Sequence, residues 1–311
     1  LFTHTDLDGA GCAALFLFAL KGKEENCFYC TPYNLSKVVE EQMCKWGDNL
    51  PTVYFADVCP TADIIAKLEE RGVEFMVFDH HATNTLPSSN ITIEETLDGR
   101  KTCGTELLCR WLAANKFLKE TEFLQEFVEI IRTRDVFDFS SPEARERALK
   151  LFTLFNLYGI RRFSKVFAFR LLEADAEERS AGDIFNITET LLISAKLEKD
   201  AELISSFTPK SVSTVTVDGH KTALILNSKG QNISDISDAF LAAYPEYDIV
   251  IGVSFGYGAG GYSLRSSKDI DLGAIGKRLG AGGHARGAAG GKMSNEVGKQ
   301  ISLLLEADLN R

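Results

Sequence analysis

The sequence predicts an α/β protein, with a doubly wound parallel sheet in an N-terminal domain, a helical connector and a smaller α+β domain. Short apolar runs that alternate with helical patterns predict the parallel sheet. From residue 212 the pattern changes to hairpins and glycine-rich bends, which predicts a separate module. The 311 residues suffice for two cores. We therefore expect domains at 1–182 and 208–311, a connector over 183–207, and a cleft between the domains.

The N-terminal strands are predicted from apolar runs bounded by turn residues. They cover residues 1–3, 27–33, 52–57, 73–78 and a short segment near 91–93. Apolar residues at helical spacing predict the intervening helices over 12–21, 35–46 and 61–71. Gly9 and Gly11 are expected to form a tight turn before the first of these. Strands and helices that alternate in this way form parallel sheets, which bind ligands at the carboxyl ends of their strands.

The rest of the chain is predicted from helical spacing and turn signals. Helices are expected over 105–117, 122–132, 143–157, 161–172 and 183–206. The dipeptide Asp218-Gly219 is a strong turn signal, which predicts a hairpin of 213–217 with 221–227. The last part should hold a helix over 233–244, a hairpin of 247–255 with 261–266, a helix over 272–279, a glycine-rich loop over 280–291 and a closing helix.

Composition and charge exclude several classes of protein. A net charge of −10 argues against coating of long nucleic acid, because cationic contacts to phosphate supply most of that affinity. Seven scattered cysteines argue against a disulfide framework, and Cys27 and Cys30, which have no second pair, are interpreted as buried thiols. The apolar stretch 13–20 is shorter than the roughly 20 residues that span a bilayer, and its acidic flank is untypical of a signal peptide. We expect a cytoplasmic protein with no membrane partner.

Acidic and imidazole side chains gather at the ends of three predicted strands and after one helix. In chain order they are His4, Asp6, Asp8, Asp57, Asp79, His80, His81 and Asp135, with Asp138 as the alternative to the last. Crowded carboxylates resist ionisation unless positive charge lies among them, and two divalent cations would supply it. Oxygen and nitrogen ligands without thiolate suit Mn²⁺ or Mg²⁺ better than structural zinc. Pairs of such ions promote attack of water on phosphorus.

This ordered set of motifs resembles the DHH phosphoesterase superfamily, and more closely its members with a DHHA1 C-terminal domain. The motifs are H-x-D-x-D-G-x-G from His4, the strand-terminal Asp57, Asp79-His80-His81, a later aspartate, and Gly-Gly-His-x-x-Gly-Ala-Ala-Gly from Gly282. The likeness covers nearly the whole chain. The group includes nanoRNases (oligoribonucleases), pAp phosphatases, cyclic-dinucleotide phosphodiesterases and RecJ-type exonucleases.

The resemblance implies a role for each of these residues. One metal would be held by His4, Asp6 and Asp57. The other would be held by Asp8, Asp57, His80 and Asp135, with Asp57 bridging. The catalytic residues would be His81, facing the scissile phosphate, and Asp79, orienting a histidine.

The C-terminal module is expected to bind the nucleotide part of the substrate, as the resemblance implies. Residues 260–295 carry six Lys or Arg against two Asp, a local charge of +4 in an acidic chain. Backbone amides of a glycine-rich loop approach anions closely. The predicted substrate-binding residues are Arg265, Ser266, Gly282, Gly283, His284 and Arg286.

The leading hypothesis is a two-metal phosphodiesterase that hydrolyses short oligoribonucleotides to mononucleotides by metal-activated water, with Mn²⁺ expected first and Mg²⁺ second. A pAp phosphatase, or a phosphodiesterase for cyclic or linear dinucleotides, would use the same metals, and the sequence does not separate these. A hypothesis of another class is a nucleotide- or RNA-binding module without catalysis. The expected partner is a short oligonucleotide or nucleotide, not a long duplex, and a homodimer stays open.

Overall fold

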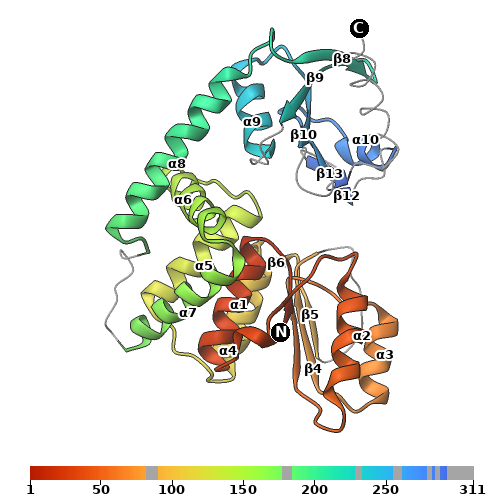
Figure 1. The fold of residues 1–311 in the computed structure, drawn as a ribbon, viewed down its shortest axis with the longest axis vertical. Helices are drawn as coiled ribbons and strands as arrows, with labels where there is room; N and C mark the ends of the chain where they lie inside the picture. The colour runs from red at the N-terminus through yellow and green to blue at the C-terminus, as the bar shows by residue number, and fades with distance from the viewer. Residues whose placement is uncertain are drawn as a thin grey trace, which may run out of the picture. The chain divides into compact units, whose positions relative to one another are not determined.

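The computed structural model describes residues 1–81, 90–176, 184–227, 233–254, 261–278, 282–283 and 288–292 (Figure 1). The chain forms two compact units, Leu1–Lys196 and Leu197–Arg311. The division falls inside helix α8 (Ile187–Ser206), which lies within the expected connector. The domain limits at 182 and 207 remain a prediction.

The first unit is built on a five-stranded parallel sheet in the order β2-β1-β3-β4-β5. Its strands are β1 (Phe2–Thr3), β2 (Phe28–Tyr29), β3 (Val53–Ala56), β4 (Phe75–Asp79) and β5 (Ile91–Ile93). Helices α2 (Leu35–Trp46) and α3 (Ala62–Glu70) cover one face, and α1 (Leu7–Ala19) and α4 (Gly104–Ala114) cover the other (Figure 1). This confirms the doubly wound α/β fold. The strand order reverses between β1 and β3, the position at which such sheets bind ligands.

Apolar side chains bury the sheet on both faces. Phe2, Phe55 and Val77 from the strands pack with Val39 of α2 and Leu68 of α3, and all five are at most 1% exposed. On the other face α1 is buried along its length from Leu7 to Phe16, because it lies against α4 and against two further helices, α5 (Glu122–Asp135) and α7 (Ile160–Asp175). Helix α6 (Pro142–Tyr158) packs against both α5 and α7.

The start of α1 differs from the prediction. The helix begins at Leu7 rather than near residue 12, so Gly9 and Gly11 lie inside it and not in a turn before it. Close packing explains both glycines. A Cβ on Gly9 would lie 2.2 Å from the carbonyl oxygen of His4, and one on Gly11 would lie 2.4 Å from the hydroxyl of Thr105. The chain therefore turns into the helix within the acidic motif, where Asp6 caps the helix and accepts the amide hydrogen of Gly9.

The second unit contains a six-stranded mixed sheet in the order β12-β13-β11-β10-β9-β8. Its strands are β8 (Ser213–Val217), β9 (His220–Asn227), β10 (Ile249–Ser254), β11 (Gly261–Arg265), β12 (Gly282–Gly283) and β13 (Ala288–Lys292). Helices α9 (Ile233–Ala243) and α10 (Leu272–Arg278) pack on the sheet. Asp218 and Gly219 both have positive φ, 50° and 83°, as the predicted two-residue hairpin turn requires.

The glycine-rich stretch is not a loop throughout. Where it is described it forms β12 and β13, and β13 pairs with β11. A Cβ on Gly290 would lie 3.0 Å from the carbonyl oxygen of Tyr262, so the absence of a side chain there permits close strand contact. The predicted closing helix lies outside the described residues. Among those that are described, no helix has the length and apolar character needed to cross a membrane.

Candidate metal centre

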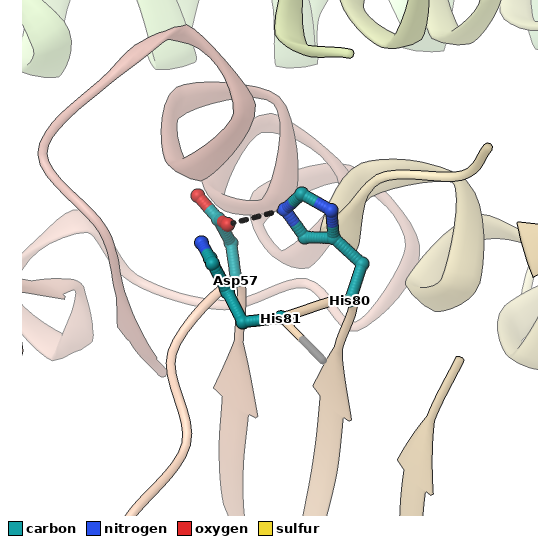
Figure 2. Close-up of side chains that lie close together, drawn as sticks. All are labelled: Asp57, His80 and His81. Atoms are coloured by element: carbon teal, nitrogen blue, oxygen red, sulfur yellow. Dashed lines mark ion pairs between the residues drawn. The ribbon is translucent and has the colours of Figure 1, made fainter. Parts of the chain in front are cut away.

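The predicted acids and imidazoles converge beyond the carboxyl ends of β1, β3 and β4. His80 lies in their midst, with its Nε2 atom 3.3 Å from Oδ1 of Asp57, 3.4 Å from Oδ2 of Asp135 and 3.9 Å from Oδ2 of Asp8. Figure 2 shows the His80 ring, at the end of β4, directed at the Asp57 carboxylate beyond β3.

The second imidazole of this kind is His4, which lies on the other side of Asp57. Its Nδ1 atom is 2.6 Å from Oδ2 of Asp6 and 3.8 Å from Oδ2 of Asp57. Asp57 thus presents one oxygen toward His4 and the other toward His80. Three sets of side chains have ligand atoms that all lie within 4.8 Å of one another: His4, Asp6 and Asp57; Asp8, His80 and Asp135; and Asp57, His80 and His81. The first two match the ligand sets that the family resemblance implies, except that the implied second set also includes Asp57.

The N-terminus of α4 positions two of the carboxylates. The amides of Gly104 and Thr105 donate to the two oxygens of Asp8 at 2.7 and 2.8 Å. Gly104 also lies against Asp57, because a Cβ at this position would be 2.7 Å from the Asp57 Cβ. Asp57 itself has a φ of 60°, a left-handed conformation that aspartate tolerates better than most residues. Sequence analysis missed both α4 residues; the only signal was a small residue before a helical pattern.

The electrostatics of the centre favour bound cations. Burial, and then the charges of Asp6 and Asp8, raise the pKa of Asp57 and of Asp135 well above the ordinary range. Burial lowers the pKa of His80, which favours the neutral imidazole that a metal requires. Asp57 Oδ2 and His80 Nε2 are buried and have no hydrogen-bond partner. Divalent ions would offset the carboxylate charge and satisfy both atoms, so the donor set fits Mn²⁺ or Mg²⁺.

His81 points to the same region but is more exposed than His80. Its Nδ1 atom donates to Oδ1 of the buried Asp79 at 2.7 Å, and its side chain is 45% exposed. That hydrogen bond raises the pKa of His81 despite partial burial, and it fixes the ring orientation. Asp79 thus orients a histidine, the arrangement that the family resemblance implies.

The structure separates Asp135 from its alternative. Asp135 is the last residue of α5, not a residue beyond the helix, and its carboxylate faces His80. Asp138 instead accepts from the buried Arg132 at 2.9 Å, and Arg132 also donates to the Lys101 carbonyl. The side chain of Asp138 is thereby held in an ion pair.

The predicted substrate-binding residues lie in the second unit, and the structure describes four of the six. Arg265 on β11 lies 3.7 Å from Asp238, and the Ser266 hydroxyl donates to the Asp248 carbonyl and accepts from the Lys268 amide. Gly282 and Gly283 form strand β12. His284 and Arg286 lie outside the described residues. Part of the local positive charge is paired, because Lys268 bonds Asp248 and Arg278 bonds Asp218.

The Cys27-x-x-Cys30 pair is separate from this centre. Both cysteines are free and buried, and burial raises each thiol pKa to about 11. Such thiols are poor nucleophiles and poor metal ligands at neutral pH.

Comparison with known proteins shows what the chain resembles in sequence and in fold. No family model matches the chain. The chain is 27% identical over 307 residues to oligoribonuclease NrnB of Bacillus subtilis (strain 168). The aligned region covers 96% of this chain and 73% of that protein. Two solved structures share the fold. The pGpG-specific phosphodiesterase PggH from Vibrio cholerae has a TM-score of 0.51 at 16% identity, over 99% of this chain and 98% of that one.

The second is RecJ from Thermus thermophilus in complex with Mn²⁺, with a TM-score of 0.55 at 17% identity, over 98% of this chain and 51% of that one. The similarity to NrnB and the fold shared with PggH and RecJ agree with the resemblance to the DHH phosphoesterase superfamily that the sequence motifs indicate.

Proposed function

We propose that this chain is a divalent-metal-dependent phosphodiesterase that hydrolyses short oligoribonucleotides to mononucleotides. The observation that carries the proposal is the pair of ligand sets on either side of Asp57, one with His4 and one with His80. The similarity to an oligoribonuclease over 96% of the chain supports the substrate class.

Some side chains of the centre would bind the metal ions, and another would donate a proton or a hydrogen bond to the substrate. Bound divalent ions supply Lewis-acid activation of water and offset charge on phosphoryl oxygens. The Asp8 carboxylate is held by two backbone amides and is therefore pre-oriented, and the Asp57 backbone is anchored because its amide donates to the Phe78 carbonyl. The neutral His80 completes the donor set.

His81 is the proposed proton donor or hydrogen-bond donor to the phosphate. Its raised pKa keeps the imidazolium populated at higher pH than usual, and Nδ1 is engaged by Asp79. The protonated ring therefore presents Nε2–H from a side chain that is 45% exposed. A donor of this kind stabilises charge that develops on phosphoryl or leaving-group oxygens.

A short substrate fits the charge of the chain. The net charge of −10 repels long polyanions, whereas a substrate of a few nucleotides needs few phosphate contacts. We propose that the second unit supplies those contacts through Arg265, Ser266, Gly282, Gly283, His284 and Arg286.

The test is hydrolysis by metal-free protein to which Mn²⁺ or Mg²⁺ is added. Labelled di- to pentaribonucleotides are compared with pAp and with linear and cyclic dinucleotides, by kcat/KM. We expect mononucleotide release from the short RNAs, with Mn²⁺ at least as effective as Mg²⁺, and none with Asp57→Asn. Preferred hydrolysis of pAp or a cyclic dinucleotide would replace the proposed substrate, and no metal-dependent hydrolysis of any substrate would overturn the proposal.

A further inference from the structure

An exposed phenylalanine lies next to the candidate metal centre in a costly backbone conformation. Phe137 is two residues beyond Asp135, so their Cα atoms are at most about 7 Å apart. Its φ of 54° is in the left-handed region, which is unfavourable for a residue other than glycine. The residue is nevertheless 54% exposed, so burial of the side chain does not account for this conformation.

The ring of Phe137 is held in place on two sides. The guanidinium of Arg134 lies over the ring, 5.4 Å from its centroid, and Phe139 meets it edge-on at 5.9 Å and 84°. Arg134 also lies 4.1 Å over the ring of Phe152 on α6, which anchors it to a neighbouring helix. The backbone beneath is fixed as well, because the Asp138 amide donates to the Thr133 carbonyl at 3.1 Å.

An aromatic ring fixed in this way is pre-organised for a flat apolar ligand. Arg134 lies over one face of the ring and Phe139 meets its edge, yet more than half of the residue's surface remains exposed. Every nucleobase has a face that stacks on an aromatic ring, and the interaction requires no particular base.

We propose that Phe137 is a stacking platform for one nucleobase of the substrate, beside the metal centre. This rests on the proposed phosphodiesterase function and adds a binding residue that the acid and imidazole motifs do not contain. The backbone strain has a use in this account, because it holds the ring out of the core at a place where a ligand can reach it. Since stacking reads no base edge, it favours short oligonucleotides of any sequence.

The test compares matched dinucleotide substrates with matched variants. The substrates are pApA and its two analogues in which one or the other nucleotide is abasic. The variants are Phe137→Ala, Phe137→Leu and Phe137→Tyr, with Phe169→Ala as the control. Phe169 lies on the regular helix α7, is 60% exposed and belongs to none of the ligand sets.

For Phe137→Ala we expect the KM of pApA to rise about 5- to 150-fold with little change in kcat, the range that base stacking of about 1–3 kcal/mol implies. Phe137→Leu should resemble Phe137→Ala, whereas Phe137→Tyr and Phe169→Ala should resemble the unmodified protein. One of the two abasic substrates should be insensitive to Phe137→Ala. An unchanged KM for pApA, equal losses on all three substrates, or unmodified behaviour of Phe137→Leu would overturn the platform.

Failure of the proposed function is distinguishable from failure of the platform. If the unmodified chain does not hydrolyse pApA, the function fails, and equilibrium binding of AMP in the presence of Mn²⁺ then tests the ring. Weaker AMP binding by Phe137→Ala than by Phe169→Ala would uphold the platform, and equal binding would overturn it.

Discussion

Replacing Asp57 by asparagine should stabilise the metal-free fold and abolish its response to metal. The substitution keeps the shape of the side chain and removes its charge. Ligand oxygens of Asp57 and Asp6 lie within 4.8 Å of each other, and two unit charges at that distance repel by about 3 kcal/mol at an effective dielectric constant of about 20. Protonation of Asp57, and the contact of Asp6 with His4, relieve part of this repulsion.

We therefore expect a net gain of about 1–2 kcal/mol, the usual size for removal of a functional destabilisation. For a unit of this size that corresponds to a rise in Tm of about 2–8 °C without metal. Mn²⁺ at 100 times its Kd should stabilise the unmodified protein by about 2.7 kcal/mol and should leave Asp57→Asn unchanged. Differential scanning fluorimetry with and without Mn²⁺ measures both effects.

Asp138→Asn is the matched control, because Asp138 pairs with Arg132 rather than facing His80. This variant should lose stability and keep the metal-induced rise in Tm. A lower Tm of metal-free Asp57→Asn, or a metal-induced rise equal to that of the unmodified protein, would refute the assignment of Asp57 as the shared ligand.

Three further predictions concern the pH dependence of stability, the packing of Gly104 against Asp57, and the buried ion pair between Arg170 and Glu189 of α8. The folded state holds protons on Asp57 and Asp135 that the unfolded chain releases near pH 4, so the contribution of these protons to stability is lost as pH rises above that value. As pH rises, the Tm of the unmodified metal-free protein should therefore fall relative to the Tm of Asp57→Asn. Bound Mn²⁺ should reverse this trend. Gly104→Ala should weaken Mn²⁺ binding about 10- to 100-fold by calorimetry, because its Cβ would collide with Asp57. Glu189→Gln should cost about 3–5 kcal/mol in urea unfolding, because it breaks a buried pair in which both carboxylate oxygens lie 2.7 Å from Arg170.

Each of these has a control and a contrary outcome. A Cβ on Gly261 would lie 3.5 Å from its nearest neighbour, so Gly261→Ala should keep the Mn²⁺ affinity, and equal losses in the two glycine variants would contradict the packing argument. Glu24→Gln breaks the more exposed pair with Arg161 and should cost less than about 1 kcal/mol. A loss of unfolding free energy in Glu189→Gln no larger than that in Glu24→Gln would contradict the argument from the buried ion pair. A Tm difference between the unmodified protein and Asp57→Asn that does not change with pH would contradict the argument from protonation.

The parallel sheet and the site at its edge could be predicted because both depend on local pattern. Apolar runs that end in Asp57 or in Asp79-His80-His81 place those residues where parallel strands end, whatever lies farther away in the chain. The start of α1 could not be predicted in this way, because glycine serves equally in a turn and in a close contact. Only the contacts in the folded chain, with the carbonyl of His4 and the hydroxyl of the distant Thr105, show which use applies to Gly9 and Gly11.

Long-range pairing explains what else the sequence did not reveal. Spacing alone left Asp135 and Asp138 as alternatives, and the contact of Asp138 with Arg132 separates them. Likewise, a count of charges over 260–295 did not include Asp218 and Asp248, which lie on neighbouring segments and pair with Arg278 and Lys268. The hydrogen bonds from the amides of Gly104 and Thr105 to Asp8 join residues that are almost a hundred positions apart in the sequence, so local pattern could not reveal them.

The most direct test of the metal centre is the number of ions that it binds. Isothermal titration of metal-free protein with Mn²⁺ should give two ions per chain. Asp135→Asn, which alters only the set with His80, should weaken one of the two sites, and Asp57→Asn should weaken both. A single ion or none in the unmodified protein, or an unchanged titration of Asp57→Asn, would contradict a centre in which two ions share that carboxylate.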